Sequence, residues 1–576
     1  MRKRPPVCTR ERALKFATAV IALGAAIAVP ATAQDFGERR TTVSGLPLTA
    51  DQQAITPEHL WLDIWVDPEA QSIKGRAEYA LEIADPASKI EMELDQRFRV
   101  TRVSLGKIEL PAEGFRHTDG LLTVPLEGAR SANGRIALRV DFEGEPRTAP
   151  NAPWDGGFVW SQTSDGEPWI ATAMQGQGCD LLFPCIDYPT KEIGRVDSTI
   201  WVPAESRLYA AGNGKLLGIE DKGDWRGYKW SARQPNTYAI ALNIAPYGVI
   251  ERTHRAPSGQ DVPLAFYHLR GDEAGAARML DELAKYLDWF ERRIGPYPFA
   301  DEKAGIAQTP HLGMEHQTIN AYGNGFRESD EPYDWLLFHE FAHEWFANQM
   351  TNRSNADMWL HEAAASYMEA LYLRDVAGED AYRAKLDEYL PRIVSKVPVA
   401  PGAGIDSGSY LDSSGWGGDI YFKGSWILHT LRELIGDEAF FRSLTRLVYG
   451  TAEPKPGAIT PIYRDTDEFR QIVEEETGRD LEWFFDVYVR QPAMPLLKGT
   501  RDGATLTLEW EVPGNRTFQM PVEVKIGERT IVAEFENNRA RVDLGSATAP
   551  FTVDPDAKML RGLPEPVLTP PPPRRN

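Results

Sequence analysis

The sequence predicts a multidomain α+β protein with an N-terminal antiparallel β domain, an α-rich middle domain and a small C-terminal β-sandwich. Three observations support this prediction. The chain has 576 residues, which is more than one ordinary domain needs. Apolar and polar residues alternate as in strands from about residue 60 to 247, whereas apolar residues after about 270 recur at helical spacing. Strand patterns return after residue 492.

The first 33 residues have the three parts of a secretory signal peptide. A basic stretch precedes an apolar run from Phe16 to Pro30, and small residues occupy positions 31 and 33. This run is shorter than the ~20 apolar residues that span a bilayer. We expect residues 1–33 to be cleaved and the protein to be exported, to the periplasm or the medium. An uncleaved membrane anchor is the alternative.

The chain beyond this segment is strongly acidic. Residues 1–33 hold six Lys/Arg and one Glu, so the remainder carries a formal charge of −26 when the whole chain carries −21. Nucleic acids and anionic lipids attract basic surfaces. We therefore expect neither as a partner, and we expect no stable membrane insertion after cleavage of the signal.

Two cysteines remain after cleavage, Cys179 and Cys185. Six residues of extended strand would separate them by ~20 Å, but a disulfide needs Cα atoms within ~7 Å. A bridge therefore requires a turn between them, and the sequence leaves this open.

The N-terminal β domain is expected over residues 34–248. Gly, Pro and Asp separate its alternating segments, as in half-buried antiparallel strands. The clearest segments are WLDIWVD, GRAEYALEI, KIEMELD, LLTVPL and RIALRVDF.

The α-rich domain is expected over residues 249–492. Met279, Leu283 and Phe290 fall on one helical face, and Gly295-Pro296 ends that helix. Further helices are predicted at about 334–350, 361–375, 424–448 and 466–490.

The C-terminal β-sandwich module is expected over residues 493–563, followed by a Pro-rich tail over 564–576. Its predicted strands are ATLTLEWEV, MPVEVKIG, RTIVAEF, RARVDL and PFTVDP.

The helical segment DWLLFHEFAHEWFANQM places His339 and His343 one turn apart on the same side. Two imidazoles at this spacing can share one zinc ion, which lowers the pKa of a bound water toward 7. Glu340, next to the first ligand, can take that water's proton as general base. The pattern therefore predicts metal-assisted hydrolysis.

A third protein ligand is needed to complete such a centre. Position 349 is Gln, which excludes the metzincin class, whose third His lies there. Glu362 lies nineteen residues beyond His343 on a second predicted helix, and an antiparallel arrangement would return it to the histidines. The alternative is that both histidines are ordinary side chains of a buried helix.

HEFAH with eighteen residues before Glu362 resembles the gluzincin metallopeptidases of the aminopeptidase N and leukotriene hydrolase type. LGMEH (312–316) is similar to their GxMEN motif. YFKG, which contains Tyr421, is similar to the motif of their catalytic tyrosine. FPCIDYP (183–189) is similar to their FPCxDEP segment. The resemblance covers about Trp61 to Leu560. It implies a thermolysin-like catalytic domain, one zinc ion, and peptide substrates with a free N-terminus.

The resemblance also implies how substrate is bound. A carboxylate can hold the protonated amine beside the metal by charge-assisted hydrogen bonding, and Glu315 matches that position. Gln175, nine residues before Pro184, sits where relatives place a substrate-binding Gln. Gly313 and Met314 of the same motif are expected to line the bound substrate.

Two further roles are expected, the first from the resemblance and the second from the position of the residue on the helix of Glu362. Tyr421 would donate a hydrogen bond to the oxyanion that forms on the attacked carbonyl. Glu369, on the same helix as Glu362, would orient a histidine ligand, although an exposed surface charge is an equal reading.

The chain departs from the family pattern at two positions, with His316 where Asn is usual and His361 where Asn is usual. His316 adjoins the amine anchor and could change the first substrate pocket or its pH response. An endopeptidase or an epoxide hydrolase on the same zinc, and an inactive peptide-binding relative, are the alternative functions. Side-chain preference and oligomeric state stay open.

Overall fold

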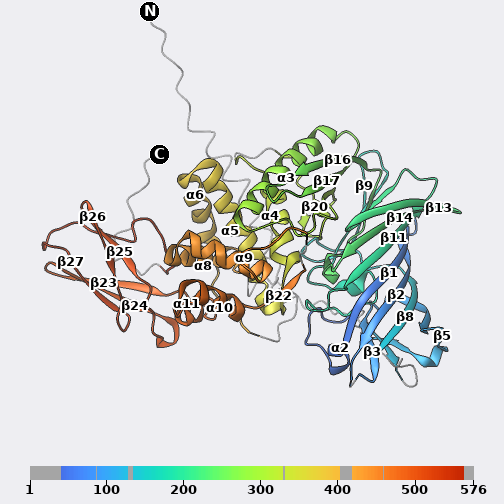
Figure 1. The fold of residues 1–576 in the computed structure, drawn as a ribbon, viewed down its shortest axis with the longest axis horizontal. Coiled ribbons are helices and arrows are strands. Elements are labelled where there is room, and N and C mark those ends of the chain that lie inside the picture. The colour runs from blue at the N-terminus through green and yellow to red at the C-terminus, as the bar shows by residue number, and fades with distance from the viewer. Residues whose placement is uncertain are drawn as a thin grey trace, which may run out of the picture. The chain divides into compact units, whose positions relative to one another are not determined.

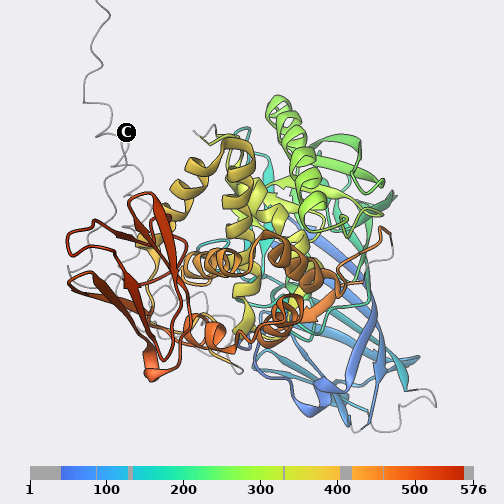
Figure 2. The same cartoon turned by 60° about the vertical axis from the view of Figure 1, so that its left-hand side comes forward.

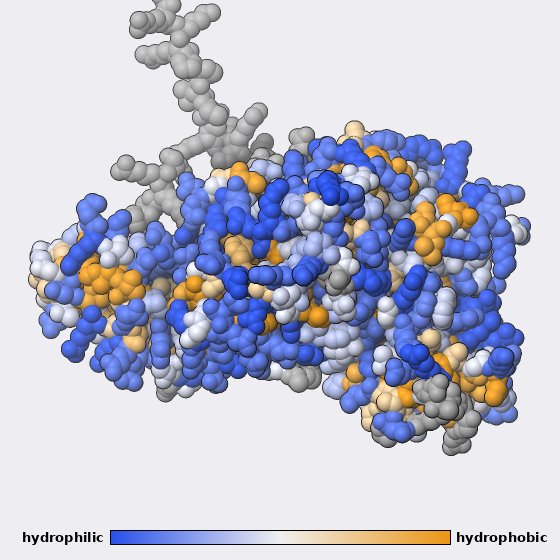
Figure 3. Space-filling view, viewed as in Figure 1, coloured by the Kyte–Doolittle hydropathy of each residue, from blue (hydrophilic) through white to orange (hydrophobic). Residues whose placement is uncertain are grey.

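The computed structural model describes residues 41–85, 87–126, 134–327, 331–402, 418–457 and 460–562 (Figure 1). The predicted signal peptide over 1–33 and the predicted tail over 564–576 lie outside the described residues. In the described ranges, no helix is long and apolar enough to cross a membrane. Hydrophilic residues dominate the face shown in Figure 3, with separate hydrophobic patches between them.

An eight-stranded sheet forms the main layer of the N-terminal part (blue to green in Figure 1). Alternate residues of its first strand, such as Leu60, Leu62 and Ile64, are buried, as the alternating sequence predicts. All neighbours pair antiparallel except β1 and β11, which are parallel. In spatial order the strands are β13 (Lys215–Lys222), β14 (Trp225–Arg233), β11 (Arg195–Pro203), β1 (Ile55–Asp67), β2 (Ser72–Ile83), β8 (Arg135–Gly144), β4 (Phe98–Leu105) and β5 (Ile108–Glu109).

Two smaller sheets and a short helix complete the N-terminal part, and they share one apolar core with the large sheet. Thr49 caps the helix by accepting a hydrogen bond from the backbone of Gln52. The elements are α2 (Ala50–Gln53), the sheet β12 (Tyr209–Ala211), β15 (Asn243–Ala245), β10 (Pro168–Ala173), β9 (Gly157–Gln162), and the sheet β3 (Lys89–Glu93), β7 (Leu121–Pro125), β6 (Arg116–Thr118).

Cys179 and Cys185 form a disulfide, which decides the question that the sequence left open. A tight turn over Cys179–Leu181 reverses the chain between them, so their Cα atoms lie 6.3 Å apart. This loop follows Gln175, one of the predicted substrate-binding residues.

The middle of the chain combines a five-stranded sheet with helices. The helix predicted over the stripe from Met279 to Phe290 is confirmed, and its apolar face is buried. The sheet order is β16 (Gly248–Arg255), β17 (Asp261–His268), β18 (Ala304–Gln308), β20 (Asn320–Tyr322), β19 (Gly313–Met314). The helices are α3 (Glu273–Arg293), α4 (Trp335–Ala342), α5 (Trp359–Ala377), α6 (Glu379–Tyr389), α8 (Phe422–Ile435), α9 (Asp437–Tyr449), α10 (Thr466–Thr477) and α11 (Glu482–Tyr488).

Three helix predictions need correction. The segments 424–448 and 466–490 were each expected as one helix, but Gly436 and Gly478 divide each into two. Both glycines have positive φ (85° and 65°), a conformation that ends a helix and that glycine adopts without strain. The segment 334–350 is helical only to Ala342, because Phe346 and Ala347 depart from helical geometry.

Two three-stranded sheets form the C-terminal part (red in Figures 1 and 2). They share one apolar core with the helices of the middle part, and Tyr488 of α11 packs on Phe518 with 5.5 Å between ring centroids. The sheets are β23 (Leu496–Asp502), β24 (Thr505–Glu511), β27 (Arg539–Asp543), and β26 (Arg529–Ala533), β25 (Val522–Ile526), β28 (Thr552–Val553). A small pair, β21 (Met350–Asn352) and β22 (Ile462–Arg464), links the helical segments.

Candidate metal centre

Two helices present the predicted metal ligands. Asp334 caps α4 by accepting a hydrogen bond from the backbone of Leu337, which fixes the start of the helix one turn before His339. His343 ends the same helix, and Glu362 lies in the first turn of α5. The two helices pack together, so residues far apart in sequence meet.

The three predicted ligands converge at one point. Nε2 of His339 lies 3.3 Å from Nε2 of His343, and each of these atoms lies 3.5 Å from Oε2 of Glu362. Among the described residues, this is the single group of three His, Cys, Asp or Glu side chains whose ligand atoms lie this close together. Two imidazoles and a carboxylate are the ligand set of a catalytic zinc site with one open position.

The other ring nitrogens of both histidines are occupied by hydrogen bonds. Nδ1 of His343 donates to the carbonyl of Phe346 at 3.0 Å, and Nδ1 of His339 contacts Oε1 of Glu369 at 3.0 Å. A carbonyl can only accept, so His343 carries a proton on Nδ1 and directs Nε2 toward the point where the three ligand atoms meet. The irregular turn at Phe346 directs this carbonyl toward the ring. The site therefore fits a bound cation.

Glu369 is itself held in place. Tyr333 donates its hydroxyl to Oε2 of Glu369 at 3.0 Å, and Nζ of Lys385 lies 3.7 Å from the same oxygen. Burial raises the pKa of this carboxyl, but Lys385 and His339 together bring it below its ordinary value. Glu369 is only 5 % exposed, so the alternative prediction of an exposed surface charge is wrong.

The pKa of Glu362 follows the same balance. Burial alone would raise it, but the neighbouring His343 and His339 bring it far below its ordinary value. Glu362 is therefore anionic near neutral pH.

Glu340 faces the same site from α4 and is 8 % exposed. Burial raises the pKa of its carboxyl to about 8. The chain passes so close to this carboxyl at Gly313 that a Cβ there would lie 2.3 Å from Oε1 of Glu340. The positive charges of His339 and His343 act in the opposite direction to burial and favour the carboxylate.

Glu315 follows β19 and is held by two side chains from the N-terminal part. Its Oε1 accepts hydrogen bonds from Nε2 of Gln175 at 2.7 Å and from the hydroxyl of Tyr238 at 2.8 Å. Asn348 donates to the backbone carbonyl of Glu315 at 3.0 Å, so the residue is also fixed through its main chain. Burial raises the pKa of Glu315, while the neighbouring His343 acts in the opposite direction.

Gln175 lies beside Glu315, the other residue predicted to bind the substrate amine. Its amide N–H₂ donates to Oε1 of Glu315. An amide has an oxygen acceptor besides its N–H₂ group. Gly313 and Met314 lie in β19, and Met314 is 3 % exposed, packed against Ala173 and Ala321.

Tyr421 immediately precedes α8, and its ring stacks beside that of His339 with 6.1 Å between centroids. Two buried side chains fix the segment that carries it. Asp419 accepts the backbone N–H groups of the 394–395 turn at 2.7 and 2.6 Å. Lys423 donates to the carbonyls of Gln491 and Pro492 at 3.1 and 2.6 Å.

The two departures from the family pattern are both buried. His316 is fully buried, and burial lowers its pKa to about 3. The ring is therefore neutral near pH 7, and the pH response that the sequence suggested for it does not follow. His361 accepts a hydrogen bond at Nε2 from the backbone of Asn352 at 3.0 Å, and burial likewise lowers its pKa to about 3.

Sequence patterns did not identify Tyr238, Tyr333 or Lys385 as parts of this site. Tyr238 comes from a turn of the N-terminal part, and no motif surrounds it. Lys385 belongs to α6, which the sequence prediction omitted. Each of the three acts on a predicted residue through a contact made only in the folded chain.

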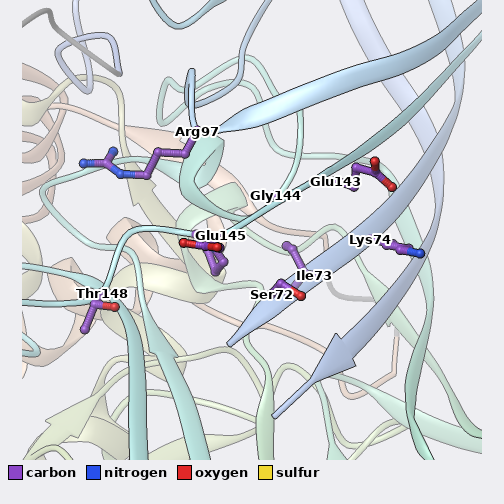
Figure 4. Close-up of a pocket in the computed structure, with 9 residues that line it drawn as sticks. Ser72, Ile73, Lys74, Arg97, Glu143, Gly144, Glu145 and Thr148 are labelled. Carbon is purple, nitrogen blue, oxygen red and sulfur yellow. The ribbon is translucent and has the colours of Figure 1, made fainter. Parts of the chain in front are cut away.

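A hollow of about 710 Å³ lies at the start of β2 and the end of β8 (Figure 4). It contains none of the predicted site residues, and its charged side chains are of both signs. They are Lys74, Arg97, Glu143 and Glu145.

Comparisons with known proteins agree with this site. Residues 324–488 match the Peptidase family M1 domain. The chain is 24 % identical to Aminopeptidase M1-B of Oryza sativa subsp. japonica, over 69 % of this chain and 46 % of that protein. It is 23 % identical to Aminopeptidase N of Lactococcus lactis subsp. lactis, over 66 % of this chain and 48 % of that protein. The chain thus spans about half the length of these curated relatives.

A solved structure has the same fold. The M1 zinc metallopeptidase from Deinococcus radiodurans superimposes with a TM-score of 0.64 at 22 % identity, covering 78 % of this chain and 97 % of that chain. The family match includes His339, His343 and Glu362, whose ligand atoms meet in the structure. Residues 324–488 therefore form a Peptidase family M1 domain, and the chain resembles the gluzincin family of aminopeptidase N.

Proposed function

We propose that this protein is a zinc-dependent aminopeptidase that removes the N-terminal residue of peptides. The observation that carries the proposal is the position of Glu315. This buried carboxylate lies within electrostatic reach of His343 and Glu362, and Gln175 and Tyr238 hold it there. An endopeptidase has no terminal substrate amine to bind at the metal, whereas an aminopeptidase must hold one there, which a further carboxylate can do by charge-assisted hydrogen bonding.

His339, His343 and Glu362 would hold the zinc ion, with Nε2 of each ring and Oε2 of the carboxylate as donors. When bound, zinc supplies a Lewis acid that polarises the scissile carbonyl and makes water more acidic. Glu369 orients His339 through Nδ1, and the carbonyl of Phe346 orients His343 in the same way.

Glu340 acts as the general base. Its carboxyl, which faces the ligand cluster from α4, takes a proton from the attacking water and can pass it to the leaving amine. Tyr421, beside His339, donates its hydroxyl to the oxygen on which negative charge develops. Asp419 and Lys423 keep this tyrosine in place.

Glu315 binds the protonated amine of the substrate and so places the first peptide bond at the metal. The amide oxygen of Gln175 adds a neutral acceptor for the same group. A peptide ligand is known in the fold family, because a variant of the Deinococcus radiodurans enzyme was crystallised with a Tyr-Ser-Ala substrate.

The test compares a free and an N-acetylated peptide as substrates. The wild-type enzyme should cleave only the free form, and Glu315→Gln should lower kcat/KM for it by roughly 100-fold while zinc content stays at one ion per chain. The exposed Glu379→Gln is the matched control. Equal cleavage of the acetylated peptide would contradict the amine-anchor role and favour an endopeptidase.

We also propose that the protein is exported. The support is the three-part segment of residues 1–33, which ends in small residues before Gln34. N-terminal sequencing of the protein recovered from the periplasm or medium should begin at Gln34. Recovery of full-length chain in the membrane fraction would instead indicate an uncleaved anchor.

A further inference from the structure

The carboxylates of Asp180, which is fully buried, and Asp187, which is half-buried, face each other beside the disulfide of the N-terminal part. Asp180 is fully buried, and its Oδ2 accepts a hydrogen bond from the hydroxyl of Thr41. Asp187 accepts from the side chain of Ser44 and the backbone of Gly45. The remaining oxygens, Oδ1 of Asp180 and Oδ2 of Asp187, are both inaccessible to solvent and have no hydrogen-bond partner among the described residues.

The two unpartnered oxygens point to one place. A Cβ built on Gly178 would lie 2.5 Å from Oδ1 of Asp180 and 2.5 Å from Oδ2 of Asp187. The oxygens are therefore at most about 5 Å apart, which is the largest span of two ligands that bind calcium at 2.3–2.6 Å. Any side chain at position 178 would fill the space between them, so glycine keeps it open.

The surrounding charge is negative. Burial is the main cause that raises the pKa of Asp180 above its ordinary value, and the charge of Asp187 is the next. Asp95 and Glu93 also lie close enough to raise this pKa further. Asp95 is paired with Arg97 at 2.6 Å, but no ion pair within the described ranges includes Asp180 or Asp187. Buried carboxylates of this kind need a cation or a proton, because an unpaired buried charge is strongly destabilising.

We infer that Asp180 and Asp187 bind a hard, oxygen-preferring cation of the calcium class. Carboxylate oxygens are the ligands that calcium prefers, and its flexible coordination accepts water for the remaining positions. Asp187 lines a cavity of about 30 Å³ together with Ser44, Gly45 and Gln175, which offers room for roughly one or two waters beside this carboxylate. Sodium prefers the same oxygen ligands but carries a smaller charge.

The site would stabilise the loop next to the amine anchor. Backbone N–H groups of Gln177 and Gly178 donate to the carbonyl of Met174, directly before Gln175. A cation on Asp180 and Asp187 would fix the far end of this loop, and the disulfide already closes it. If the proposed aminopeptidase function holds, loss of the cation should raise KM, because Gln175 would hold Glu315 less firmly.

The test uses zinc-loaded enzyme freed of other divalent ions, without substrate, so that its outcome does not depend on peptidase activity. Calcium chloride should bind at one ion per chain in isothermal titration calorimetry and raise Tm by roughly 2–5 °C. Magnesium chloride at equal ionic strength should do much less, because Mg²⁺ requires a tighter octahedral site. Sodium chloride against choline chloride tests the monovalent ion.

Asp180→Asn and Asp187→Asn should each abolish the calcium-dependent rise in Tm, whereas Asp165→Asn, at an exposed turn, should keep it. A proton shared between Asp180 and Asp187 predicts the opposite. The wild-type enzyme would then bind neither calcium nor sodium, and Asp180→Asn would be at least as stable as wild type. That result would overturn the proposal. If an Asn variant fails to fold, the calorimetric stoichiometry of the wild-type enzyme decides alone.

Discussion

Gly313 and Glu340 approach each other so closely that a Cβ at position 313 would lie 2.3 Å from Oε1 of the glutamate. This distance is shorter than any normal contact, so Gly313→Ala must displace the carboxyl of the proposed general base. A displacement of about 1 Å can lower the rate 100-fold. We expect kcat to fall by about that factor, with zinc content and Tm little changed, as measured with an amino acid 4-nitroanilide.

Gly218→Ala is the control for this prediction. Gly218 lies in β13, and a Cβ there would meet no atom within 4 Å. The activity of Gly218→Ala should equal that of the wild type. Unchanged kcat in Gly313→Ala would show that the carboxyl of Glu340 need not occupy its observed position.

Tyr238→Phe tests the support of the amine anchor from the N-terminal part. The substitution removes the hydroxyl that donates to Oε1 of Glu315 and leaves the ring in place. A hydrogen bond to a charged group contributes about 1.5–3 kcal/mol. We expect kcat/KM for peptides with a free amine to fall by about 10- to 100-fold, mainly through KM. An effect on kcat alone would contradict a role in amine binding.

Glu369→Gln tests the orientation of the metal ligand. The amide can no longer match the negative charge that Nδ1 of His339 and Nζ of Lys385 both face. Loss of such a partner typically lowers metal affinity 10- to 100-fold. Competition with a chromogenic chelator should show this weaker zinc binding. Glu379→Gln, on an exposed position of α6, is the control.

The sequence predicted the candidate metal centre better than its surroundings. Helical spacing brings His339 and His343 together, and the expected turn between two antiparallel helices returns Glu362 to them. Tyr238 has no such signal, because its contact with Glu315 joins residues 77 positions apart. A contact of this kind depends on how sheets and helices pack, which a single sequence does not specify.

The elements of the fold, too, were predicted best where a local sequence pattern specifies them. Strands were predicted where one face is buried, as in β1, because alternation records burial directly. Helix ends were misplaced at Gly436 and Gly478, where the apolar pattern continues across a break in the backbone. The disulfide of Cys179 and Cys185 could not be predicted because it depends on a turn between them.

Glu192 forms a buried contact between distant segments of the chain. It is 6 % exposed, and its carboxyl contacts the hydroxyl of Thr351 at 2.6 Å and that of Tyr463 at 3.3 Å. The hydroxyl of Thr351 also lies 2.6 Å from the carbonyl of Ala347 and has one proton to donate. A protonated Glu192 can donate to Thr351, which then donates to Ala347, so every group is satisfied.

Burial raises the pKa of Glu192 to about 8 from its ordinary value of 4.5. Between these two pH values the folded chain holds a proton that the unfolded chain has released. This contribution to stability is therefore complete below about pH 4.5 and is lost as the pH rises to about 8. The free energy of unfolding should fall by up to about 1.4 kcal/mol per pH unit in this window.

Glu192→Gln should remove this dependence, because an amide keeps a donor for Thr351 at every pH. Chemical denaturation at pH 5, 6, 7 and 8 should show the variant gaining stability relative to the wild type at each step. Glu220→Gln, on the exposed strand β13, should follow the wild-type curve. Parallel curves for the wild type and Glu192→Gln would mean that Glu192 is ionised in the folded chain. The hydroxyl of Thr351 would then have to donate to the carboxylate of Glu192. The carbonyl of Ala347 would then receive no hydrogen bond from Thr351.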